Sequence, residues 1–129
     1  MRLVAAAVAA LALAAPAAAA GTPYSFGREG GNIRPFSVTI SSSGTVHVVG
    51  PVNVGRRKLT SAQLAAIGKV VTSAGFGKLP ATTLCPRTLP DIAATFVSVG
   101  SKTVRVHGNC LARYAKVWNA LTAAVRISY

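Results

Sequence analysis

The chain has very few side chains that can act as acids or bases near neutral pH. Among 129 residues, Glu29 and Asp91 are the only carboxylates, and His47 and His107 are the only histidines. Glycoside hydrolysis would require two carboxylates that converge, but Glu29 precedes a glycine-rich turn and Asp91 precedes a strand-like segment. No Gly-x-Ser-x-Gly nucleophile elbow is present. We therefore predict that the protein is not an enzyme and uses no cofactor; a small hydrolase that depends on His47 or His107 is the alternative.

Cysteine is limited to Cys85 and Cys110. An even number of cysteines favours a disulfide in an exported chain, and the apolar residues 1–20, described next, predict export. The bridge would close 110 − 85 = 25 residues, for which the loop-entropy model gives about 3.5 kcal/mol of stabilisation. A zinc site built from both cysteines with His47 and His107 is the alternative, but no short Cys or His pair recurs as it does in structural zinc sites. We predict a disulfide and no metal.

The long apolar run of the sequence is confined to residues 1–20. Arg2 precedes an Ala/Leu/Val run that ends in Ala18-Ala19-Ala20, the pattern of a secretory signal peptide with an Ala-x-Ala cleavage site. We expect cleavage after Ala20, which leaves residues 21–129 as a single domain, secreted or held in the cell envelope, with no membrane span. An uncleaved anchor is the alternative, disfavoured by Pro16 and the predominance of alanine.

Positive charge dominates the remaining chain. Without Arg2, 14 − 1 = 13 lysines and arginines face two acids, a formal charge of +11. Such a protein is attracted to anionic surfaces, among them anionic cell-envelope polymers. The basic residues are scattered, apart from Arg56-Arg57-Lys58, and they are not interleaved with stacking aromatic residues. Specific nucleic-acid binding is therefore not expected.

The clearest local signal is a helix between Leu59 and Phe76. Thr60 and Gln63 form a capping box at its start, and Leu59 precedes them as a hydrophobic staple. Gly75 suits the left-handed position that ends a helix. The apolar stripe of this helix consists of Leu64, Ile67, Val70, Val71 and Ala74.

The segments on either side of this helix alternate as strands do. We predict strands over residues 24–28, 36–40, 45–49, 92–99 and 103–107, a loop over 77–91, and a second helix from Cys110. The second helix carries the apolar stripe Tyr114, Val117, Trp118, Leu121 and Val125. The simplest arrangement is an α+β fold in which an antiparallel sheet of two hairpins carries both helices on one face, in the order ββαββα.

The loop over residues 27–35 is the candidate partner-binding surface. Its paired glycines permit tight or positive-φ backbone that other residues resist, and a rigid sheet can hold such a loop outward. A simple hairpin connection is the alternative interpretation. The candidate contact residues are Arg28, Glu29, Gly30, Gly31, Asn32, Ile33 and Arg34.

Several motifs follow one another in an order that resembles a known family. They are Gly30-Gly31 after an early strand, Phe36-Ser37-Val38, the helix ending Ala74-Gly75-Phe76-Gly77-Lys78-Leu79-Pro80, the strand Thr103-Val104-Arg105-Val106, and a terminal amphipathic helix. In these features the chain resembles the emfourin-type proteins, small inhibitors of thermolysin-like metalloproteases. The resemblance implies a compact α+β domain that blocks a protease through exposed loops, with Gly30 and Gly31 as the matched loop. The chain departs from those proteins in its basic charge and its cysteine pair.

The sequence thus favours an exported, non-enzymatic, monomeric binding domain, with inhibition of a secreted metalloprotease through the 27–35 loop as its specific form. The alternative function is that of a basic structural or adhesive module of the cell envelope, suggested by the +11 charge that remains after residues 1–20 are removed.

Overall fold

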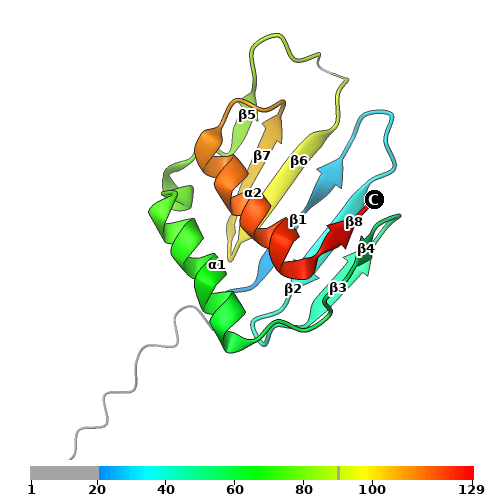
Figure 1. Ribbon diagram of the computed structural model, residues 1–129. Coiled ribbons are helices and arrows are strands. Elements are labelled where there is room, and N and C mark those ends of the chain that lie inside the picture. Colours follow the sequence, from blue (N-terminus) through cyan, green and yellow to red (C-terminus); the bar gives the residue numbers. More distant parts are fainter. Residues whose placement is uncertain (1–20, 90) are drawn as a thin grey trace, which may run out of the picture.

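The computed structural model of the protein describes residues 21–89 and 91–129, so the predicted signal peptide lies outside the described residues. The elements before and including the first helix are β1 (Tyr24–Glu29), β2 (Phe36–Ile40), β3 (Val46–Val49), β4 (Asn53–Val54) and α1 (Ser61–Ser73). They are followed by a 3₁₀ turn, η1 (Phe76–Lys78), and by β5 (Thr82–Leu84), β6 (Ala94–Val99), β7 (Lys102–His107), α2 (Ala112–Val125) and β8 (Ile127–Ser128). The larger sheet has the order β3-β2-β1-β6-β7-β5, and both helices lie over one of its faces (Figure 1). The predicted α+β class is confirmed.

The first three strands form an antiparallel meander. The hairpin of β2 and β3 places Ile40 opposite Val46, and the alternating side chains of β2 are buried on the helix-covered face as their period predicts. His47 lies on the other phase of β3 and is exposed.

Within the described residues, no helix is long and apolar enough to cross a bilayer.

β1 joins the two halves of the sheet, because it pairs with β2 on one side and with β6 on the other. Its glycine, Gly27, permits a close approach: a Cβ atom there would lie 2.1 Å from the carbonyl oxygen of Phe36 and 3.0 Å from the ring of Phe96. The hairpin of β6 and β7 is also present, and Val104 and Val106 are buried as predicted.

The predicted ββαββα order and the sheet of two hairpins are wrong in three respects. Three strands of the large sheet, and not two, precede α1. The segment predicted as a loop over residues 77–91 contains β5, which pairs with β7 in parallel and makes the sheet mixed. Finally, β4 and β8 form a separate two-stranded sheet. Strands of two or three residues are too short to carry a recognisable period in the sequence.

The first helix has the ends that the sequence predicts. The Thr60 hydroxyl accepts a hydrogen bond from the Gln63 amide at 3.2 Å, and the Gln63 side chain accepts one from the Thr60 amide at 2.9 Å. Gly75 is left-handed at φ 64°, and Phe76, only 1% exposed, closes the core beyond it. The capping box is confirmed.

The second helix supplies the other half of the core. It begins at Ala112 rather than at Cys110, and its predicted apolar residues are buried except for Trp118, which is half-buried. The Trp118 ring meets Phe26 edge to face at 5.5 Å. At the far end the Arg56 guanidinium donates to the carbonyl oxygen of Ala124 at 2.8 Å, so a long-range arginine satisfies a terminal carbonyl of the helix.

The predicted disulfide between Cys85 and Cys110 is confirmed, with Cα atoms 5.6 Å apart. It joins the residue after β5 to the segment just before α2. Because both sulfur atoms are in the bridge, the alternative zinc site would have no thiolate ligands, and no group of three or more His, Cys, Asp or Glu residues occurs in the described part of the chain.

Candidate binding surface at one end of the sheet

The connection between β1 and β2 is an exposed loop at one end of the sheet (Figure 1). The last residue pair of this hairpin is Arg28 with Phe36, so the chain between them leaves the β1–β2 ladder. Gly30 and Gly31 both have positive φ, 73° and 66°, as their sequence position suggested. Residues 30–35 are all exposed, and Ile33 shows 52% of its surface.

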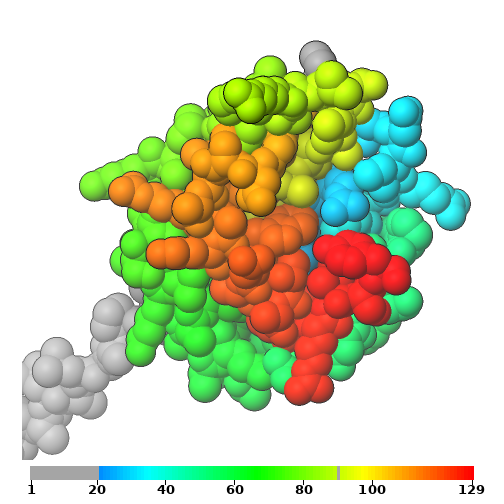
Figure 2. Space-filling model, turned by 45° about the horizontal axis from the view of Figure 1, so that its top comes forward, coloured from blue at the N-terminus to red at the C-terminus, as the bar shows by residue number. Residues whose placement is uncertain are grey.

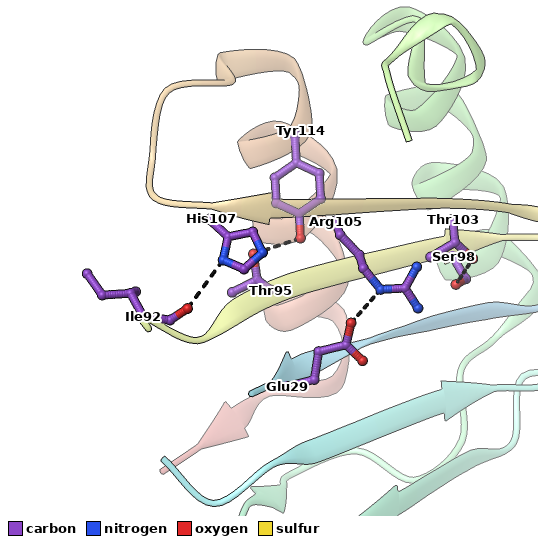
Figure 3. Close-up of polar contacts among 8 residues, drawn as sticks. All are labelled: Glu29, Ile92, Thr95, Ser98, Thr103, Arg105, His107 and Tyr114. Carbon is purple, nitrogen blue, oxygen red and sulfur yellow. Dashed lines mark hydrogen bonds and ion pairs between the residues drawn. The ribbon is translucent and has the colours of Figure 1, made fainter. Parts of the chain in front are cut away.

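An ion pair fixes the start of this loop. The guanidinium of Arg105 on β7 donates to the carboxylate of Glu29 on β1, across the intervening strand β6 (Figure 3). The two side chains are 48% and 42% exposed, so the pair contributes at most about 1 kcal/mol to stability. The strand positions of the two residues place the pair on the sheet face opposite the helices.

A second exposed region, which comprises residues 86–89 and 91–93 and is called the second loop below, lies directly against the first. A Cβ atom on Gly31 would lie 2.6 Å from the backbone nitrogen of Ala93 and 3.0 Å from the carbonyl oxygen of Asp91. The His107 ring is hydrogen-bonded to the carbonyl oxygen of Ile92 through Nδ1 at 3.2 Å (Figure 3). The backbone of the second loop is therefore supported from β7 as well as from the glycine loop.

Three aliphatic side chains project from the two loops into solvent: Ile33 at 52%, Leu89 at 63% and Ile92 at 46% exposure. Arg34 and Arg87, both exposed, belong to the same loops. Ile33, Leu89 and Ile92, together with these two arginines, are the side chains that the two loops present to solvent. Exposed aliphatic residues with arginine beside them are typical of protein-binding surfaces, since arginine is enriched at interfaces.

Arg28 differs from the other predicted loop residues. Its strand position places it on the helix-covered face, in phase with Tyr24 and Phe26, and its guanidinium carbon lies 5.9 Å from the ring centre of Phe36 and 5.7 Å from that of Tyr129. These are cation–π distances. Arg28 therefore faces the opposite side of the sheet from Glu29.

The few titratable side chains are more clustered than the sequence suggested. Glu29, Asp91 and His107 all belong to this end of the sheet, whereas His47 lies on the edge strand β3. Glu29 is engaged by Arg105, and one ring nitrogen of His107 by a backbone carbonyl. Asp91 is exposed on the second loop.

Behind the loops, Tyr114 of α2 is buried and donates its hydroxyl to Thr95 at 2.8 Å (Figure 3). Burial raises the pKa of Tyr114 to about 12, which the hydrogen bond to Thr95 only partly offsets. The phenol is therefore neutral over the physiological range, and its hydrogen bond to Thr95 joins α2 to β6.

Comparison with models of known protein families gives no match, and comparison with curated proteins finds no significant relative. Sequence reasoning identified the glycine loop but missed Leu89, Ile92 and Arg105, because these residues reach the site only through the pairing of β1 with β6 and of β6 with β7.

Proposed function

We propose that the protein is an exported, non-enzymatic binding domain that inhibits a secreted thermolysin-like metalloprotease through the 27–35 loop. The observation that carries the proposal is the close packing of Gly31 against the backbone of residues 91–93. A loop fixed in this way loses little conformational entropy on binding, which is how rigid inhibitor loops gain affinity. Ile33 is the apolar side chain that this loop presents.

The proposed role without catalysis rests on how the scarce titratable groups are used. Catalytic acids and bases work within pockets that exclude water, but Glu29 is ion-paired on the surface and Asp91 and His47 are exposed. Alanine substitution of His47 and of His107 tests this part: loss of a hydrolytic activity in either variant would favour the hydrolase alternative.

The inhibitor proposal is tested by titrating a secreted thermolysin-like protease with the chain of residues 21–129. We expect slowing of peptide hydrolysis at micromolar protein or below. Ile33→Asp should weaken inhibition by at least about tenfold, since a buried interface anchor contributes about 2 kcal/mol or more. Leu84→Asp is the matched control, because Leu84 is 57% exposed on β5, outside both loops. No slowing at micromolar protein would end the inhibitor proposal.

The two glycines provide a second matched pair. Gly30 and Gly31 have similar positive φ, but an added Cβ meets nothing within 4 Å at Gly30 and meets backbone at 2.6 Å at Gly31. Gly30→Ala should therefore cost only the local strain of about 1–2 kcal/mol, whereas Gly31→Ala must separate the two loops. If inhibition depends on the packing of the two loops against each other, Gly31→Ala weakens inhibition much more than Gly30→Ala does. Equal effects would show that loop packing is irrelevant to binding.

A second function, adhesion to anionic polymers of the cell envelope, is favoured by the charge distribution. Among the described residues only one ion pair forms, between Arg105 and Glu29, so the remaining cationic groups are not neutralised by carboxylates of the chain. Retention of the protein on anionic cell-wall polymer should fall steeply between about 50 and 500 mM salt, because screening shortens the range of such attraction. Retention that does not change with salt would argue against this function.

A further inference from the structure

A hollow of about 340 Å³ opens on the helix side of the sheet, between the N-terminal half of α2 and the ends of β1 and β6. Its volume falls within the range of small-molecule sites, about 300–1,000 Å³. In Figure 2 the blue atoms of the β1 region reach the surface where the yellow, orange and red segments meet. The side chains that matter for its chemistry are Arg28, Asn109, Tyr114, Trp118 and Asn119.

Arg28 is the one cationic side chain in the lining. Within the described residues the single ion pair is that of Arg105 with Glu29, and Arg28 has no hydrogen-bond acceptor. The rings of Phe36 and Tyr129 hold its guanidinium through their faces, which leaves its N–H donors unused. Arg28 is therefore a half-buried arginine whose position is fixed by two aromatic rings and which has no anionic partner. Such a guanidinium can bind an anion from solution.

The remaining walls complement an anion with an apolar body. Asn109 and Asn119 are exposed, and neither side-chain amide has a partner among the described residues. The hydroxyl of Tyr114 is committed to Thr95. The Trp118 ring, stacked on that of Tyr114 with centres 6.5 Å apart, provides a flat wall.

We propose that this hollow binds the carboxylate of a small organic acid that has a flat or aromatic body. The carboxylate pairs with the Arg28 guanidinium, whose planar fork matches two carboxylate oxygens, and the body lies against Trp118. The single positive charge in the lining matches a monoanion better than a phosphate of charge near −2. The site is on the opposite face from Glu29 and does not depend on protease inhibition.

The single tryptophan of the chain makes the proposal directly measurable, since Trp118 lines the hollow. The first probes are benzoate and its neutral counterpart benzamide, titrated at constant ionic strength while the fluorescence of Trp118 is followed. We expect saturable binding of benzoate and binding of benzamide weaker by at least about tenfold, the value of one charge-assisted contact. N-acetylphenylalanine and its amide form a second arm, which distinguishes the carboxyl end of a peptide from a free acid.

Three variants connect the signal to the site. Arg28→Met should abolish the preference for benzoate over benzamide, and Arg28→Lys should retain part of it because charge remains while the fork is lost. Asn119→Leu removes an exposed, unpartnered amide from the lining and should weaken benzoate binding. Arg57→Met is the matched control, because Arg57 is exposed and outside the hollow, and it should bind as the wild type does.

The proposal is overturned by any of four results. These are the absence of saturable benzoate binding below about 50 mM, equal binding of benzoate and benzamide, a loss in Arg57→Met equal to that in Arg28→Met, and tighter binding of inorganic phosphate than of benzoate. Far-UV circular dichroism of each variant verifies that it is folded. If Arg28→Met does not fold, the benzoate–benzamide comparison in the wild type still decides.

Discussion

Replacing Cys85 and Cys110 with alanine removes the only disulfide of the described chain, which joins the edge strand β5 to the start of α2. The bridge closes 25 residues. In the loop-entropy model, opening it restores unfolded-state freedom equivalent to about 3.5 kcal/mol at 25 °C. Cys85 is 4% exposed, so its truncation adds a smaller packing loss of about 1 kcal/mol.

The expected loss is large for a domain of this size. Natural domains have a stability of about 5–15 kcal/mol, and each kcal/mol corresponds to about 4–8 °C in Tm for a domain near 100 residues. With about 4.5 kcal/mol lost in total, we therefore expect Tm to fall by roughly 18–36 °C in the double variant. The urea m-value should rise, because an unbridged unfolded chain exposes more surface.

Urea and thermal unfolding, followed by far-UV circular dichroism, measure these quantities. Wild-type protein reduced with a phosphine at the same pH separates the two contributions, since reduction opens the loop and keeps the Cys85 side chain. Reduced wild type should lose slightly less stability than the double variant. If reduction costs less than about 1 kcal/mol while the fold persists, the loop-entropy reasoning is wrong for this protein.

Three further substitutions test the fold. Gly27→Ala places a Cβ 2.1 Å from the Phe36 carbonyl, so it should cost more than about 3 kcal/mol or prevent folding; a loss below about 1 kcal/mol in urea unfolding contradicts the strand contact. Thr60→Ala removes half of the capping box and should cost about 1 kcal/mol by the same assay, whereas no change would mean that water replaces the cap. Tyr114→Phe removes the bond to Thr95 and should cost about 1 kcal/mol at pH 7. Because the folded-state pKa of Tyr114 is raised to about 12 from 10.0, its contribution is fully present below pH 10 and is lost as the pH rises toward 12. The wild type should therefore lose stability over that window more steeply than Tyr114→Phe, and parallel stability curves for the two proteins would refute the assignment.

Features encoded in consecutive residues were predictable from the sequence. The capping residues Thr60 and Gln63 and the terminator Gly75 are local signals, because each acts on backbone groups a few residues away. The phases of β2 and β7 followed from alternation, since a strand with one buried face must repeat every second residue. The disulfide followed from an even cysteine count in a chain with an export pattern.

The order of the sheet and the composition of the site were decided only by the tertiary structure. Alternation gives a strand its buried face but not its neighbour, so the central position of β1 between β2 and β6 could not be inferred. β5 pairs with β7 in parallel over three residues, and β4 pairs with β8 over two. Segments this short show no recognisable alternation of apolar and polar residues in the sequence. These pairings bring residues 91–93 beside Gly31 and Tyr129 beside Arg28. The glycine loop was therefore recognisable in the sequence, whereas its support and the hollow behind it depend on contacts between residues distant in the chain.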